Sequence, residues 1–367
     1  MTVYMILLAM IIFEGVIVNV KKNRSQADVR NYMILVCIEL LFIAGARGLT
    51  IGADTKAYIS GYRYFNDMQG IRMFTENDPW YISYEIGYML LMKVLAFFHV
   101  SESFFLLVIA VLIYVPICKF IYDYSKNTCL SVTVFFCIEM FGYSLGIFRQ
   151  MIAVGILLLS VKFIKEQNLI KYLLLVLLAI CFHTTSVIFL PMYWFNKLQF
   201  KKKYLLVFIA LEAFFMILTG PIISLILKIL PTYDSYVNGI YGGTGGSYVF
   251  LIFLNIIIIL CAIYVDKVNI QDLFIYNLGL YAMMIAALLQ ILAYKFVVMG
   301  RSNVCFIIFI GICLPILYKV MFTSRSYALV CFITYIFLAI YFYLTMHNVQ
   351  TFSPYYFIWE SAKTTIY

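Results

Sequence analysis

The sequence predicts an all-α integral membrane protein that crosses the bilayer many times. Of its 367 residues, 65% are hydrophobic and only 12% are charged, which lies outside the range of soluble globular domains. Apolar runs recur along the whole chain, and each approaches the roughly 20 residues needed to cross a hydrocarbon core of about 30 Å. We therefore predict a single integral membrane domain over residues 1–367.

The first apolar run predicts a retained span rather than a signal peptide, because no basic residue precedes it, no small-residue cleavage site follows it, and KKNR comes next. Ten segments in all have the character of spans: 3–19, 31–46, 103–118, 128–146, 150–163, 204–221, 248–265, 273–294, 303–318 and 327–346.

Two further stretches are harder to place. Residues 84–100 carry Glu85, Lys93 and His99, and residues 171–195 are too short for two spans and long for one. We interpret both as candidate re-entrant or partly buried helices, which are tolerated where they line a cavity or pack on protein. The prediction is therefore about 10–12 transmembrane helices.

The positions of the lysines predict which loops face the cytoplasm. If neither ambiguous stretch crosses, one side collects 13 of the 18 lysines, in the joints 20–30, 119–127, 162–171, 197–203, 266–272 and 319–326. Lysine-rich short loops mark the cytoplasm, so three segments are expected outside: the loop 47–86, the glycine-rich loop 231–247 and the tail 347–367.

The arginines run against this trend. Five of the eight fall on the predicted outer side, namely Arg47, Arg63, Arg72, Arg149 and Arg301. Three of these lie at the outer ends of predicted helices: Arg47, Arg149 and Arg301. A guanidinium there can offer a planar set of hydrogen-bond donors to phosphate or carboxylate. The alternative is that they snorkel to the membrane interface.

The loop RGLTIGADTKAYISGYRYFNDM (47–68) is dense in polar residues. Asp54 is a candidate general base, Arg63 a further candidate donor, and Thr55 and Tyr58 candidate contacts for a sugar. As an alternative, GADT is a helix cap in which Asp54 or Thr55 satisfies free backbone amides.

Two shorter motifs add candidate acid or base groups. In NDPWYISYEIGY (77–88), Glu85 directly precedes an apolar run, where low dielectric can raise the pKa of a carboxyl group towards neutrality. Trp80 and Tyr81 there also fit an ordinary interfacial role. In CFHTTSVIF (181–189), His183 and Thr184 interrupt apolar sequence, although a hydrogen-bonded packing role is equally open.

Other kinds of site have little support. The nine cysteines lie in or beside apolar segments, and without CxxC or HExxH spacing they predict neither a disulfide framework nor a metal site. The stretch YGGTGGS (241–247) lacks the lysine of a nucleotide-binding loop and reads as a flexible connector. Four glutamates in spans, at 14, 39, 139 and 212, favour a proton-coupled transporter, but they are scattered singly along the sequence.

Taken together, these motifs resemble the EpsG family of Wzy-like polymerases of bacterial exopolysaccharide, capsule and O antigen. The resemblance covers nearly the whole chain, through Arg47-x4-GADT-x2-Tyr58, YEIGY (84–88), FRQMIA (148–153), KYLLLVLLAICFHTTSVIFLPMYW (171–194), YKFVVMGRSNV (294–304) and SPYYF (353–357). The spacing of FRQ-x2-A before FH-x-(T/S) is its most specific part. It implies a helical architecture like that of the GT-C membrane glycosyltransferases.

The resemblance also implies a reaction: transfer of a growing undecaprenyl-pyrophosphate-linked glycan onto a new lipid-linked repeat unit at the outer face of the bacterial inner membrane. Other implied partners are membrane lipids, a chain-length regulator and a flippase, with no cofactor, metal or nucleic acid. The expected catalytic residues are Asp54, Glu85, Arg149, His183 and Arg301. The expected substrate contacts are Arg47, Thr55, Tyr58, Arg63, Gln150, Thr184 and Tyr355.

Within that mechanism, Arg149 and Arg301 would stabilise the departing pyrophosphate. The general base could be any of three residues: Asp54, Glu85 or His183. Sugar hydroxyls would be oriented by Gln150 and Tyr58. The alternative function is a flippase or secondary transporter for a lipid-linked glycan, and it predicts a greater need for the buried glutamates.

Overall fold

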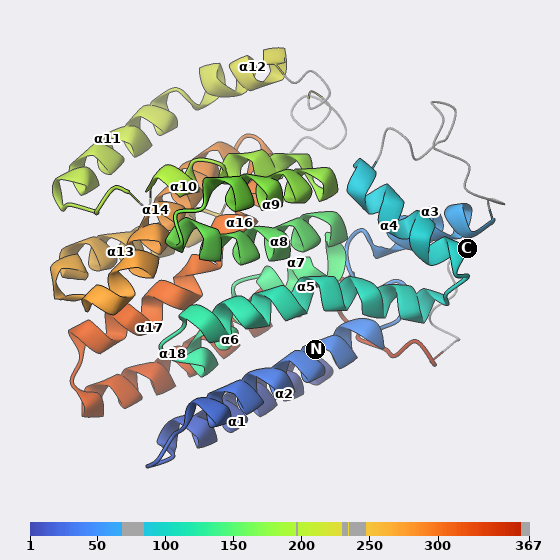
Figure 1. The fold of residues 1–367 in the computed structure, drawn as a ribbon, viewed down its shortest axis with the longest axis horizontal. Helices are drawn as coiled ribbons and strands as arrows, with labels where there is room; N and C mark the ends of the chain where they lie inside the picture. The colour runs from blue at the N-terminus through green and yellow to red at the C-terminus, as the bar shows by residue number, and fades with distance from the viewer. Residues whose placement is uncertain (68–83, 196, 230–233, 235–246, 361–367) are drawn as a thin grey trace. The chain divides into compact units, whose positions relative to one another are not determined.

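The computed structural model describes residues 1–67, 84–195, 197–229, 234 and 247–360, and these ranges are largely helical (Figure 1). No β-strand forms within them, although Arg47 and Phe357 make an isolated antiparallel bridge. The prediction of an all-α polytopic membrane protein is confirmed. Arg72, Trp80, Tyr81 and most of the glycine-rich loop lie outside the described residues.

Internal contacts divide the chain into two compact units, residues 1–190 with 329–367, and residues 191–328. The first unit contains α1 (Thr2–Val20), α2 (Gln26–Gly45), α3 (Thr55–Asp67), α4 (Ile86–Phe97), α5 (Glu102–Tyr124), α6 (Thr128–Cys137), α7 (Met140–Gly146), α8 (Phe148–Lys165), α9 (Leu169–Phe182), the 3-10 helix Thr184–Phe189 and most of α18 (Ser324–Met346).

The second unit contains α10 (Met192–Phe195), α11 (Lys203–Ile217), α12 (Thr219–Ile229), α13 (Tyr248–Tyr264), the 3-10 turn Val265–Lys267, α14 (Ile270–Ala293), α15 (Val297–Ser302), α16 (Val304–Ile307) and α17 (Phe309–Met321).

All ten predicted spans coincide with helices or bent helix pairs. Five described helices are long and apolar enough to cross a membrane, and the number rises to eight if each bent pair is one span. The remaining two are α2 and α8, which have 20 and 18 residues and three charged side chains each. The first ambiguous stretch forms the short apolar helix α4 of 12 residues. The second is broken, since α9 of 14 residues is followed by the 3-10 helix Thr184–Phe189 and by α10. At 1.5 Å per residue, α4 and α9 are only about 18 and 21 Å long.

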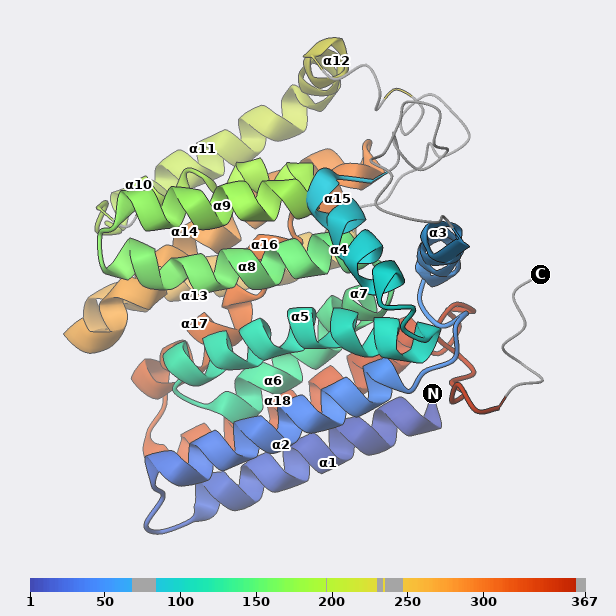
Figure 2. The ribbon, with the colours of Figure 1, turned by 45° about the vertical axis from the view of Figure 1, so that its right-hand side comes forward.

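Within the first unit, α5 packs against both α2 and α8 (Figure 2), and buried residues recur along one side of it from Phe105 to Ile121. A glycine allows one of these contacts, because a Cβ at Gly155 of α8 would lie 3.1 Å from the backbone oxygen of Leu112 and 3.3 Å from Pro116. Close packing of this kind is the main attraction between helices in a membrane, since lipid tails are as apolar as leucine.

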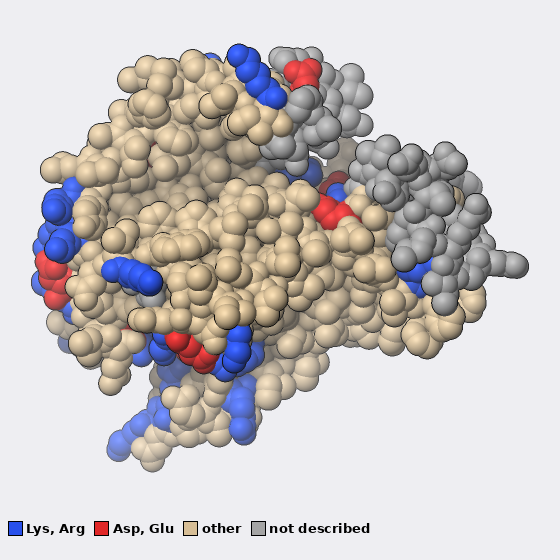
Figure 3. Space-filling model, turned by 45° about the horizontal axis from the view of Figure 1, so that its top comes forward, with Lys and Arg blue, Asp and Glu red and all other residues tan. Residues whose placement is uncertain are grey.

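Large apolar side chains also cover much of the outer surface. Examples that are more than half exposed come from five different helices: Phe13, Ile38, Leu206, Val249 and Leu329. The face drawn in Figure 3 is accordingly dominated by uncharged residues, with charged side chains confined to a few places. Exposure on this scale would make a water-soluble protein aggregate, and it fits a surface that faces lipid.

Basic residues gather at one end of the first unit. The joints α1–α2, α5–α6 and α8–α9 all lie at its left-hand side in Figure 2. Between them they carry Lys21, Lys22, Arg24, Lys126 and Lys165. Arg149 lies at the other end of α8, so about 25 Å of helix separates it from this basic end.

A paired glycine substitution tests the packing of the second unit. In α14, a Cβ at Gly279 would overlap the sulfur of Cys313 on α17, whereas nothing lies within 4 Å of a Cβ at Gly220. We expect Gly279→Ala to lower the free energy of unfolding by about 1–3 kcal/mol. Gly220→Ala should not lower it.

Thermal unfolding of both variants in the same detergent measures the difference. Equal midpoints for Gly279→Ala and Gly220→Ala would show that α14 and α17 are not packed as closely as described.

Candidate active site

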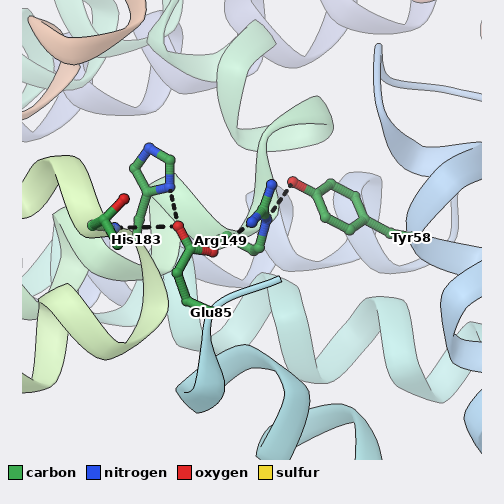
Figure 4. Close-up of polar contacts among 5 residues, drawn as sticks. Tyr58, Glu85, Arg149 and His183 are labelled. Carbon is green, nitrogen blue, oxygen red and sulfur yellow. Dashed lines mark hydrogen bonds and ion pairs between the residues drawn. The ribbon is translucent and has the colours of Figure 1, made fainter. Parts of the chain in front are cut away.

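Four side chains predicted from separate motifs meet in the first unit (Figure 4). Tyr58 comes from α3, Glu85 from the residue before α4, Arg149 from the first turn of α8, and His183 from the residue after α9. We call these four residues the Glu85 cluster. They lie at the end of α8 opposite to the basic joints of the first unit.

Glu85 is the centre of the cluster, because both of its oxygens are engaged. Oε2 forms an ion pair with Nη1 of Arg149. Oε1 lies 3.0 Å from Nδ1 of His183 and accepts a hydrogen bond of 3.2 Å from the backbone N–H of Thr184. The Glu85 side chain is only 14% exposed, so these contacts are largely sheltered from water.

These partners reverse the effect of burial on the Glu85 carboxyl. Burial alone would raise its pKa, but the hydrogen bond with His183 and the charge of Arg149 outweigh it and lower the pKa to about 2. The expectation that the pKa of Glu85 rises towards neutrality is therefore wrong. Glu85 is ionised at neutral pH and is a poor proton acceptor there.

An ionised Glu85 also fixes the tautomer of His183. A carboxylate can only accept hydrogen bonds, so Nδ1 of His183 must carry the proton in the 3.0 Å contact. In the neutral imidazole, the lone pair is then on Nε2. A histidine held in this way can take a proton at Nε2 while the carboxylate stabilises the resulting cation.

Aromatic rings surround the guanidinium of Arg149. Its carbon lies 4.9 Å from the ring centre of Tyr84 and 6.0 Å from that of Tyr58, and its Nε donates a 3.5 Å hydrogen bond to the Tyr58 hydroxyl. Tyr58 in turn stacks on Phe148 at 4.6 Å and meets Tyr88 edge-on at 5.4 Å. These rings hold the guanidinium plane and add cation–π attraction.

Sequence reasoning missed Tyr84, Tyr88 and Phe148 as parts of the site. The signal was present, because they are the outer residues of YEIGY and the first residue of FRQ. Aromatic residues are common at membrane interfaces, however, so their type alone did not separate them from others.

A glycine brings Glu85 within reach of His183. A Cβ at Gly87 would lie 2.7 Å from the backbone oxygen of Cys181, two residues before His183. Without a side chain there, the start of α4 can approach the end of α9. The backbone of His183 is extended (φ −158°, ψ 115°), which ends α9 at this point.

The GADT loop holds the corner from which Arg149 projects. Arg47 Nη2 and Thr55 Oγ1 both donate to the backbone oxygen of Leu145, at 3.2 and 3.0 Å, four residues before Arg149. Gly52 has φ of +106°, and a Cβ there would overlap the same oxygen, so glycine is required. The loop and the α7–α8 corner are thus tied to one carbonyl group.

The structure gives Arg47 and Thr55 a role in holding this turn together, and the prediction that they contact a substrate stays a prediction. Arg47 is 1% exposed and also donates to the backbone oxygens of Ala44 and Ile51, while Thr55 is 0% exposed. Both side chains donate their hydrogen bonds to backbone carbonyl oxygens that have no backbone donor in this turn.

The C-terminal tail reinforces this loop. The N–H of Gly48 donates to Tyr356 and that of Gly52 to Thr351, at 2.9 and 2.8 Å. Tyr355, predicted to bind substrate, instead donates its hydroxyl to the backbone oxygen of Ile43 at 3.0 Å. The tail residue thus packs against the chain itself, and its predicted contact with a substrate stays a prediction.

The remaining predicted residues lie near or apart from the Glu85 cluster. Asp54 is half-buried in the turn before α3 and contributes to raising the pKa of Tyr58, for which burial is the main cause. Gln150 is buried on α8, and the Thr184 side chain is exposed. Arg63 is paired with Glu102 through contacts of 2.5 and 3.3 Å, and Arg301 is an exposed residue of the second unit.

Metal-binding groups are not assembled in the part of the chain that the structure describes. No three His, Cys, Asp or Glu side chains come together there in a way that could hold an ion.

The chain matches the family model described as the EpsG family over residues 30–357. No curated protein and no solved structure matches the chain.

Acid should weaken the fold through Glu85. Its pKa of about 2 lies below the ordinary value of 4.5, so the ionised group stabilises the folded chain above pH 4.5. That stabilisation is lost as the pH falls from 4.5 towards 2. We expect Glu85→Gln to be less stable at neutral pH and to lose less stability in this acid range.

Thermal unfolding midpoints of both proteins, measured in detergent at several pH values, give the comparison. An equally steep acid loss in Glu85→Gln would contradict the role assigned to this carboxylate.

Removing the Thr55 hydroxyl tests the loop anchor. Thr55→Val keeps the shape but leaves the oxygens of Ile51 and Leu145 with one donor fewer, and we expect about 1 kcal/mol of lost stability. Thr184→Val is the matched control, because that side chain is exposed. Unfolding in detergent should separate the two variants, and equal stabilities would show that the anchor is unimportant.

Proposed function

Because the chain belongs to the EpsG family of Wzy-like polysaccharide polymerases, we propose that it joins lipid-linked oligosaccharide repeat units into a polysaccharide. The donor is a growing glycan on undecaprenyl pyrophosphate, and the acceptor is a sugar hydroxyl of a new lipid-linked repeat. The observation that carries this proposal is the Glu85 cluster, which places an arginine and an oriented histidine on one carboxylate.

The proposed step is a single glycosyl transfer. The acceptor hydroxyl attacks the anomeric carbon of the donor and loses its proton to Nε2 of His183. The bond between that carbon and the pyrophosphate oxygen breaks, and its electron pair leaves with the pyrophosphate. Arg149, held between the rings of Tyr58 and Tyr84, stabilises the negative charge that develops there.

Glu85 serves both halves of this step. Towards His183, it fixes the tautomer with Nε2 free and stabilises the imidazolium that forms. Towards Arg149, it neutralises the guanidinium before substrate arrives. A pyrophosphate carries more negative charge than a carboxylate, so it competes for Arg149 when it binds.

We place the reaction at the outer face of the bacterial cytoplasmic membrane. The joints with most lysines of the first unit gather at the end of α8 away from Arg149. Lysine-rich joints favour the cytoplasm, and this supports an outward-facing Glu85 cluster. A lipid-linked pyrophosphate lies at the level of the head groups, which is also the level of the helix ends.

A flippase for a lipid-linked glycan is the second candidate, and one observation favours it. Glu14 on α1 and Glu39 on α2, which are distant in sequence, lie close enough for their carboxyl groups to interact. A carboxyl pair between membrane helices is typical of proton-coupled transport. The polymerase is favoured because the Glu85 cluster assembles a general base and a leaving-group site together.

Lipid-linked glycans from cells lacking the protein test the choice. The cells are complemented with wild type, Arg149→Ala, His183→Ala or the control Lys162→Ala, which alters an exposed residue in the last turn of α8. We expect Arg149→Ala and His183→Ala to accumulate single repeats at the outer face and to lower polymer formation by roughly 100-fold or more.

Mass spectrometry of the glycans, with matched protein levels, gives the readout. Single repeats that stay on the cytoplasmic side would identify a flippase. Long chains at wild-type levels in Arg149→Ala would remove Arg149 from the mechanism.

A further inference from the structure

The second unit contains a pocket of about 250 Å³. It lies where the end of α11 and start of α12, the start of α13 and the end of α14 meet. Its volume is slightly below the roughly 300–1,000 Å³ of typical small-molecule sites, so it has room for part of a ligand.

One wall of this pocket is apolar. Leu251 and Ile291 are buried there, and Met216 adds hydrocarbon surface from a third helix. A hydrocarbon chain that replaces water on such a wall gains roughly 25 cal/mol for each Å² buried. The wall therefore suits the tail of a lipid.

The lining also contains polar and aromatic groups. Tyr248 and Tyr294 lie with ring centres 4.5 Å apart, and Lys295, the residue after Tyr294, also lines the pocket. The buried Gln290 donates to the backbone oxygen of Ser247 at 3.5 Å and accepts from Asn303 at 2.8 Å, which holds this part of the lining in place. A lysine ammonium and tyrosine hydroxyls are both suited to phosphate oxygens.

The pocket lies at the end of the second unit that is poor in lysine. The 17 residues of α13 separate Tyr248 from the turn Val265–Lys267, a length of about 26 Å. At that far end, Lys202 pairs with Asp266 at 2.7 Å, beside Lys201 and Lys203. The rule that lysines mark the cytoplasm places the pocket on the outer side.

The proposed reaction needs two lipid-linked substrates, and each carries its own phosphate groups. The Glu85 cluster supplies one arginine for one leaving pyrophosphate. We propose that the pocket in the second unit holds the other substrate, with a lipid phosphate at Lys295 and the first part of its hydrocarbon tail against Leu251 and Ile291. This inference rests on the proposed function for the identity of the lipid, but not for the pocket's preference for a phosphorylated hydrocarbon.

A photoreactive farnesyl phosphate tests the pocket directly on the purified full chain in detergent. Cross-linked peptides are identified by mass spectrometry, and labelling is expected in the segments around Leu251 and around Ile291. Leu251→Trp should fill the pocket and reduce this labelling by about tenfold. Ile252→Trp is its control, because that neighbour is exposed on α13 and does not line the pocket.

A second pair of variants tests the head group. Lys295→Ala should reduce labelling several-fold, whereas Lys203→Ala, at the opposite end of the unit, should not. Farnesol should label the same segments more weakly than farnesyl phosphate. Equal labelling by farnesol, or wild-type labelling in Leu251→Trp, would overturn the proposed site.

Competition identifies the source of the phosphate. Displacement of the probe by undecaprenyl phosphate but not by phosphatidylglycerol supports a substrate site. Equal displacement by both would make it a site for ordinary phospholipid, and displacement by a free oligosaccharide alone would make it a glycan site. Either result would overturn the proposal.

The glycan assay keeps this test separate from the proposed function. Polymer formation with no label in the pocket would remove the pocket and leave the polymerase. Labelling of the pocket together with no polymer formed by wild type would rule out the polymerase and keep the lipid site.

Discussion

The negative charge of Glu85 organises the candidate active site. A guanidinium and an imidazole at the ends of apolar helices are costly to hold in place without a partner. One carboxylate engages both, through an ion pair with Arg149 and a contact with His183. Because its two oxygens engage different helices, Glu85 links the start of α8 to the end of α9 and balances the charge between them.

Small residues make this arrangement sterically possible. Gly87 lets the start of α4 approach Cys181, and Gly52 lets the GADT loop approach Leu145. The motifs YEIGY and GADT thus combine a polar residue with a glycine for a physical reason. Each glycine allows the close backbone contact that brings its polar neighbour into position.

Much of the fold could be predicted from the sequence, since apolar runs of span length need helices in a membrane. The breaks within spans could not. Glu139, between α6 and α7, has a left-handed backbone (φ 68°) inside a run that hydropathy treats as continuous. The division into two compact units also depends on contacts between distant segments, which hydropathy does not report.

The four residues of the Glu85 cluster could be predicted one by one, but neither their roles nor the aromatic rings around them could. Arg47 and Arg149 look alike in sequence, since both are arginines at the end of a predicted membrane helix. Only the structure shows that Arg47 is saturated by backbone oxygens while Arg149 faces a carboxylate. Likewise, the pKa of Glu85 depends on partners that are distant in sequence, so burial alone gave the wrong direction.

Because the residues of the Glu85 cluster are far apart in the sequence, they are synthesised at different times. Glu85 is made 98 residues before His183, so at about 5–20 residues per second the two are separated by roughly 5–20 s. Arg149 follows Glu85 by 64 residues, so for about the first two thirds of that interval neither partner of the carboxylate exists, and His183 is missing until its end. The contacts that anchor the start of α4 are therefore completed only after α9 has been made, and the first two helices are placed in the bilayer before them.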